Sequence, residues 1–238
     1  MSIAPGPGPG PGPGPVSAPE PGPAPGPVSV PAPAPGPAPA PRLFLLVGPP
    51  AVGKLTLAHE LERRSGAIVV DNHLVNNTVF VPMGMHREAG VELAQTDALR
   101  ERVWEIVLDA TEAAPAQLSH VFTVWLLDNE EGAAHVERLR SLAERRGARF
   151  VPVWLTASPE ALQSRVDAPG RAERHKLTDW QILSELLELP MLPPPADALC
   201  LELSTAGSAE AAVKILDSLG SHSPGSTAKR PAGGASTR

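Results

Sequence analysis

Five short apolar runs recur along the chain, and each is followed by a segment with helix signals. The runs cover 42–47, 67–70, 120–127, 149–155 and 198–203. The first and third are almost wholly apolar, as in strands that are covered on both faces. Helices are predicted over 54–64, 88–114, 131–146, 159–166, 178–189 and 208–219. Strands that alternate with helices in this way predict an α/β fold, in which a parallel sheet lies between helices.

The segment 72–80 fits neither strand nor helix spacing. Pro82 and Gly84 follow it and predict a break in the chain. Ser158 and Thr178 are expected to cap the helices that begin after them, because their hydroxyl groups can accept from the first free N–H groups.

The two ends of the chain differ in composition from the rest. Residues 1–41 alternate Pro, Gly and Ala with a single charge, Glu20, and more than half of the 30 prolines lie there. Such a segment has no apolar face to bury, so we predict a disordered tail with polyproline II character. A proline-rich docking ligand is the alternative. Residues 221–238 are also predicted to be a disordered tail, which leaves 42–220 as one domain.

Charge and cysteine content narrow the class of protein. The net charge of −6 argues against a broad nucleic-acid or membrane surface. The single cysteine, Cys200, lies in an apolar run and is predicted to be a buried structural thiol. Neither a membrane-spanning run nor the pattern of a signal peptide is found, so a cytoplasmic location is expected.

The run 42–47 ends at a loop with the spacing of a phosphate-binding motif. Gly48, Gly53 and Lys54 form G-x-x-x-x-G-K between an expected strand and an expected helix. Such a loop offers backbone N–H groups and a helix dipole to an anion, and its lysine reaches the outer phosphates of ATP or GTP. A glycine turn with an exposed lysine is the alternative. The predicted phosphate-binding residues are Gly48, Pro49, Pro50, Ala51, Val52, Gly53, Lys54, Leu55 and Thr56.

The residue after the lysine departs from the usual motif. Leu55 stands where a serine or threonine normally ligates magnesium, and the first hydroxyl group comes one residue later, at Thr56. We therefore predict that Thr56 contributes to a Mg²⁺ site.

Two carboxylates follow expected strands and are candidates for chemistry. Asp71 could accept a proton from an attacking hydroxyl group, and Asp128 could hold the water shell of Mg²⁺. Because ligands in open parallel sheets bind at the carboxyl ends of the strands, both residues are expected near the phosphate loop. A turn or helix-cap role is the alternative for each.

Basic residues cluster after the fourth expected strand. Arg171 and Arg174 lie in a charged loop, and Arg165 precedes them on a helix. Arginines in a mobile loop could close over a transferring phosphoryl group, whereas the alternative is a solvated charged loop. Secondary candidates for substrate contacts are Arg87, Arg100 and Arg102. They rank lower because arginines on a long helix usually lie on its solvent-exposed face.

Three short motifs, GPPAVGKLT, the NHL of 72–74 and the KLTD of 176–179, resemble those of the small P-loop kinases. This group holds nucleoside monophosphate kinases, shikimate and gluconate kinases and chloramphenicol phosphotransferase. The resemblance is closest to a branch labelled AAA-family ATPase or shikimate-kinase-like, and it covers most of 42–219.

The resemblance implies a three-layer P-loop NTPase fold with a five-stranded parallel sheet of order 2-3-1-4-5, the cofactors ATP and Mg²⁺, and a lid after the fourth strand. Asp71 matches the position that meets the acceptor hydroxyl group in shikimate kinase and chloramphenicol phosphotransferase. Arg165 matches an arginine beside the adenine or phosphates, and Arg171 and Arg174 match lid arginines loosely. Monophosphate kinases are similar in placing threonine one residue later, at the position of Thr56.

The chain also departs from these relatives. The glycine-rich third-strand segment of shikimate kinases is replaced by LLDNEEG, the D-G-F-P-R segment of adenylate kinases is missing, and the finger and sensor parts of AAA machines are not found. The sequence therefore predicts an ATP-dependent kinase of a small hydroxylated acceptor. The alternatives are a nucleotide-binding ATPase or switch without an acceptor, a nucleic-acid end kinase, and an adaptor with an inert P-loop fold.

Overall fold

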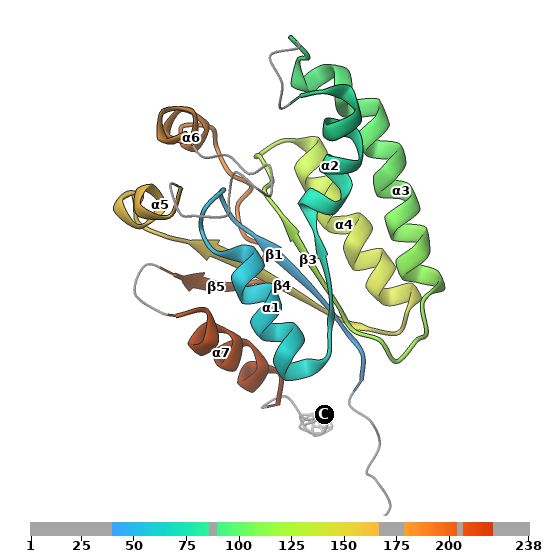
Figure 1. Cartoon of the computed structure of the whole chain (residues 1–238). Helices are drawn as coiled ribbons and strands as arrows, with labels where there is room; N and C mark the ends of the chain where they lie inside the picture. The colour runs from blue at the N-terminus through green and yellow to red at the C-terminus, as the bar shows by residue number, and fades with distance from the viewer. Residues whose placement is uncertain (1–39, 86–89, 167–178, 204–206, 221–238) are drawn as a thin grey trace, which may run out of the picture. The chain divides into compact units, whose positions relative to one another are not determined.

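A computed structural model describes residues 40–85, 90–166, 179–203 and 207–220. Its centre is a five-stranded sheet in the order β2-β3-β1-β4-β5, in which every neighbouring pair is parallel (Figure 1). The strands are β1 (Arg42–Val47), β2 (Ile68–Asp71), β3 (His120–Val124), β4 (Arg149–Thr156) and β5 (Leu199–Glu202). The predicted fold class and strand order are confirmed.

Helices connect the strands and cover the sheet. They are α1 (Lys54–Ser65), α2 (Asn72–Met83), the 3₁₀ helix η1 (Leu93–Thr96), α3 (Asp97–Ala113), α4 (Glu130–Arg145), α5 (Pro159–Val166), α6 (Trp180–Leu187) and α7 (Ser208–Gly220). None of the helices in the described ranges combines the length and the apolarity that a membrane span requires.

The sheet has a separate apolar cluster on each face, as the unbroken apolar strands predict. Phe44 and Leu46 of β1 pack with α1 and α7, while Leu43, Leu45 and Val47 pack with α3 and α4. Alternate side chains of a strand point to opposite faces, so β1 contributes to both clusters at once. This central strand therefore holds the loop that follows it between two packed layers.

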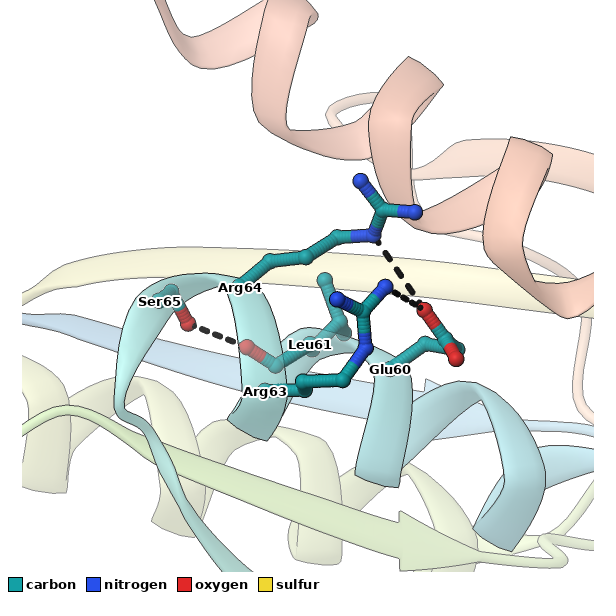
Figure 2. A network of polar contacts seen from close by, with 5 residues as sticks. All are labelled: Glu60, Leu61, Arg63, Arg64 and Ser65. Atoms are coloured by element: carbon teal, nitrogen blue, oxygen red, sulfur yellow. Dashed lines mark hydrogen bonds and ion pairs between the residues drawn. The ribbon is translucent and has the colours of Figure 1, made fainter.

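Helix α1 shows how the polar face of a covering helix is stabilised. Arg63 and Arg64 both donate to the Glu60 carboxylate, at 2.7 and 3.2 Å, and Ser65 Oγ donates to the Leu61 carbonyl at 2.7 Å (Figure 2). Because these ion pairs face solvent, they contribute little to stability. The helix is held mainly by its buried stripe.

The segment 72–83 is helical, which the sequence left open. Helix α2 continues through Pro82 and ends at Gly84, whose φ of 74° is left-handed and whose N–H donates to the Phe80 and Val81 carbonyls. Pro82 lies in the last turn, where its missing N–H removes only one hydrogen bond. The predicted break therefore comes at the glycine.

Several predicted boundaries shift. The long helix begins at Asp97, not at residue 88, because η1 precedes it with Glu92 and Gln95 in a capping box. The third strand ends at Val124, and 125–127 continue as a loop with a bridge to Met191. Helix α6 begins after Asp179, whose carboxylate accepts from two helix N–H groups, so the predicted cap at 178 is wrong.

Cys200 is exposed, so the predicted burial of this thiol is wrong. It lies on β5, an edge strand with exposed and half-buried residues in alternation, and it points to the uncovered side. The predicted tails 1–41 and 221–238 lie outside the described residues, except for residues 40 and 41.

Candidate functional site: a phosphate loop beside a cavity

The loop after β1 is shaped by close backbone packing. A Cβ atom on Gly48 would lie 2.7 Å from the Leu155 carbonyl oxygen of β4, so only glycine fits there without a shift. The Gly48 N–H donates to the Val124 carbonyl of β3 at 3.3 Å. Ala51 and Gly53 have left-handed backbones, with φ of 64° and 110°. These contacts fix the loop against both neighbours of β1.

Lys54 folds back over this loop at the start of α1. Its Nζ donates to the carbonyls of Gly48 at 2.6 Å and Pro49 at 2.9 Å. Gly53 is the N-cap of α1, and no side chain caps this helix end. The first helical N–H groups and the positive end of the dipole therefore face the loop, as anion binding requires. Thr56 lies exposed in the same turn.

Arg165 reaches the loop from α5. Its guanidinium donates to the Val52 carbonyl at 3.0 Å and to the Leu203 carbonyl at 2.5 Å. It therefore joins α5, the phosphate loop and the end of β5 through one side chain. The structure brings this predicted nucleotide-binding arginine to the loop, where it contacts the backbone.

Asp71 lies at the carboxyl end of β2, at the N-cap position of α2. Its carboxylate makes no capping hydrogen bond to the helix and instead accepts from Thr123 Oγ1 at 2.5 Å. Thr123 stands in register between Asp71 and Leu46 of β1. With strands about 4.8 Å apart, the Asp71 backbone lies roughly 10 Å from β1.

Asp128 lies farther along, four residues after β3 ends. Its carboxylate is exposed, and its N–H donates to the Pro190 carbonyl at 2.9 Å. The neighbouring Asn129 is the side-chain cap of α4 and accepts from the Gly132 N–H at 2.8 Å. Among the described residues, no group of three or more His, Cys, Asp or Glu side chains gathers as a metal site.

The remaining basic candidates divide into two groups. Arg171, Arg174 and Arg87 lie outside the described residues. Arg100 lines a cavity, whereas Arg102 is exposed on α3.

A cavity of about 510 Å³ lies between α2, α3, α4 and residues 124–126. Val124, whose carbonyl binds the Gly48 N–H, is one of its lining residues. The polar and aromatic residues that the three helices contribute are Asn72, Asn76, Asp97, Arg100, Glu101, Trp104, Glu131, His135 and Arg138.

Trp104 and His135 form an aromatic wall of this cavity. The two rings stack with centroids 4.8 Å apart and planes at 19°. Burial and, to a smaller extent, the positive charge of Arg138 lower the pKa of His135 to about 4. The His135 ring is therefore neutral at pH 7.

The sequence interpretation missed most of this cavity. Its lining residues recur at helical spacing, for example Glu101 and Trp104 on α3, or Glu131, His135 and Arg138 on α4. The same spacing is found on any solvent-exposed face of a helix, so it does not by itself indicate a cavity. A signal was present in the mixture of aromatic and charged residues on single faces, but it identifies a cavity only once the helices are packed.

A family model described as an AAA domain matches residues 43–184. A candidate kinase from Chloroflexus aurantiacus J-10-fl has a similar structure, with a TM-score of 0.54 and 15% identity over 76% of this chain and 97% of that one. A gluconokinase from Sinorhizobium meliloti 1021 has a TM-score of 0.51 and 16% identity, over 76% and 93% of the two chains. At such identities the likeness establishes the fold alone. No curated protein gives a significant match.

Proposed function

The chain belongs to the AAA domain family, and from that premise we propose that it is an ATP-dependent phosphotransferase for a small hydroxylated molecule. The recognition of the small P-loop kinase superfamily is confirmed by this family match together with the shared fold. We propose the identity of the phosphoryl donor, the class of the acceptor and the roles of the site residues.

One observation carries it: a hydrogen bond joins the phosphate loop to a residue that lines the cavity. The Gly48 N–H binds the carbonyl of Val124, which lines the cavity. On the same edge, Thr123 Oγ1 donates to Asp71 and accepts from the N–H of Asn72, which also lines the cavity. Asp71 is thus linked through Thr123 to Asn72, a residue that lines a space large enough for a small molecule.

The reaction follows from this arrangement. Lys54 and the N–H groups at the start of α1 hold the phosphates of ATP and stabilise the charge on the transferring group. The acceptor hydroxyl oxygen forms a bond to the γ-phosphorus while the bond from phosphorus to the bridging oxygen breaks. ADP leaves with that electron pair, and Asp71 takes the hydroxyl proton.

Thr56 and Asp128 are the residues proposed for magnesium. A hydroxyl and a carboxylate oxygen are hard donors that suit this ion. When bound, Mg²⁺ would neutralise charge on the phosphate oxygens. Arg171 and Arg174 are proposed to close over the transferring group, and Arg165 to position the loop.

The experiment is an assay of ADP formation with Mg-ATP over libraries of metabolites, nucleosides and antibiotics. Acceptor-dependent turnover is expected, and Lys54→Ala should abolish it. Lys214→Ala is the matched control, since this exposed lysine pairs only with Glu210 on α7 among the described residues. Asp71→Asn should lower kcat by about 10²- to 10⁴-fold while nucleotide binding persists.

The other functions predict different results. ADP formation that no acceptor changes would favour an ATPase or switch, and labelled phosphate on oligonucleotides would favour a nucleic-acid end kinase. If thermal stabilisation by ATP survived Lys54→Ala, the proposed donor site would be wrong.

A further inference from the structure

The charges that line the cavity restrict what it can hold. Three carboxylates, Asp97, Glu101 and Glu131, face two guanidinium groups, those of Arg100 and Arg138. The neutral His135 adds no charge at pH 7. The lining therefore carries one excess negative charge, and Asp71 adds another beside it.

Both guanidinium groups already have partners inside the cavity wall. Arg100 pairs with Asp97 and donates to Thr96 Oγ1 at 3.0 Å, and Arg138 donates to Glu101 at 2.6 Å. An anionic ligand at either guanidinium group would lie beside a carboxylate that already pairs with that group. The repulsion between this carboxylate and the ligand would offset the attraction of the ligand to the guanidinium group.

The third carboxylate and the aromatic wall remain available to a ligand. Glu131 makes no ion pair with any described residue. Trp104 is 5% exposed, and its Nε1 and the Nε2 of His135 are buried without a hydrogen-bond partner. Buried polar atoms without partners are rare in folded proteins, and both of these belong to residues that line the cavity.

We propose that this cavity binds an acceptor with a ring face and hydroxyl groups but no anionic group, and that carboxylates and phosphate esters are excluded. The ring packs against Trp104 and His135, and an uncharged or amine-bearing substituent lies near Glu131. This inference rests on the proposed function, because it names the acceptor class of the same site.

The test is a binding comparison of matched compounds. Uridine is paired with uridine monophosphate, a phenyl glucoside with a phenyl glucuronide, and glucosamine with glucuronate. Titration calorimetry is done with a saturating non-hydrolysable ATP analogue. The analogue occupies the phosphate loop, so the phosphate groups of the tested compounds cannot bind there. The uncharged or amine-bearing member should bind at least about tenfold more tightly in any pair that binds.

Glu101→Gln releases Arg138 and should narrow this preference by at least about fivefold, because the lining becomes neutral. Glu131→Gln should also narrow the preference for the uncharged or amine-bearing compound, and it does so without disturbing an ion pair. Glu137→Gln is the matched control: this carboxylate is also on α4 and pairs with Arg140, outside the cavity. It should leave the preference unchanged.

The outcomes separate the two proposals. Equal or tighter binding of the anionic members, or binding of no compound in either class, overturns the inference. An unchanged preference in both Glu101→Gln and Glu131→Gln overturns it as well. If the expected order is found in binding but no compound supports ADP formation, the inference holds and the proposed function fails.

Discussion

A buried arginine makes the sharpest prediction about stability. Arg146 follows α4 and is only 8% exposed, yet its guanidinium forms no ion pair with a carboxylate of the described residues. It donates instead to backbone carbonyls at the end of α3 and in the turn before β3. These acceptors are the carbonyls of Thr111, Glu112 at 3.2 Å, Ala114 at 3.0 Å, Pro115 at 3.1 Å and Leu118 at 3.0 Å.

The magnitude follows from what these carbonyls would lose. The last carbonyls of α3 have no partner within the helix and form the negative end of its dipole. A hydrogen bond to a charged group contributes about 1.5–3 kcal/mol, but five bonds from one side chain do not add. A buried acceptor that is left without its donor typically costs about 1–3 kcal/mol, and Arg146→Ala removes the donor from several carbonyls at once. This substitution should therefore lower the free energy of unfolding by about 3 kcal/mol or more.

The neighbouring arginine is the matched control. Arg145 pairs at the surface with the Glu112 carboxylate at 2.8 Å, where solvent screens the interaction. Urea unfolding followed by circular dichroism should show a large loss of unfolding free energy for Arg146→Ala. The loss for Arg145→Ala should be as small as that of an ordinary surface substitution. Arg146→Lys should fall between them, since an ammonium has three donors. Equal losses for the two alanine variants would refute the reasoning.

Three further predictions concern the same domain. Gly132→Ala should destabilise the protein by about 1–3 kcal/mol in urea unfolding, since its Cβ would collide with the Leu127 carbonyl oxygen, whereas the open Gly207→Ala should not. His135 has a pKa of about 4 in the folded state, below its usual 6.5. The contribution of its neutral ring to the free energy of unfolding is therefore complete above pH 6.5 and is lost as the pH falls towards 4. The loss amounts to about 3 kcal/mol, and His135→Phe should flatten this part of the pH profile; parallel profiles would contradict the shift. Asp179→Ala should lower stability by about 1 kcal/mol through loss of the α6 cap, and an unchanged unfolding midpoint would exclude that role.

The sheet and the phosphate loop were predictable because their signals are local. Runs of five or six apolar residues mark buried strands, and the spacing of Gly48, Gly53 and Lys54 marks the turn into α1. Gly48 also has a physical requirement, because any Cβ would meet the backbone of β4. A motif of seven residues can therefore place the phosphate loop at the carboxyl end of the central strand β1.

Helix α2 was not predictable for a reason that concerns the cavity. Val75 and Val79 are buried, but Asn72 and Asn76 on the same helix line the cavity, so polar residues interrupt the apolar stripe. A helix that serves both a core and a cavity has no clear amphipathic pattern. The same ambiguity hides Trp104, which the sequence shows only as an apolar residue of a long helix.

Arg146 could not be separated from Arg145 by sequence, since both are basic residues at the end of a polar helix. Burial of one and exposure of the other depend on where the turn after α3 passes. Short-range patterns contain no information on that position.

The contact between Gly48 and Val124 explains why the phosphate loop is easier to predict than the cavity. The loop, β1 and β3 form one hydrogen-bonded unit, in which glycine is required by backbone packing. The residues that line the cavity proposed for the acceptor stand on α2, α3 and α4, and their helices need only stay packed on the sheet. Their polar faces can therefore change without disturbing the loop, so the acceptor has to be inferred from the charges and unpaired atoms of the cavity wall.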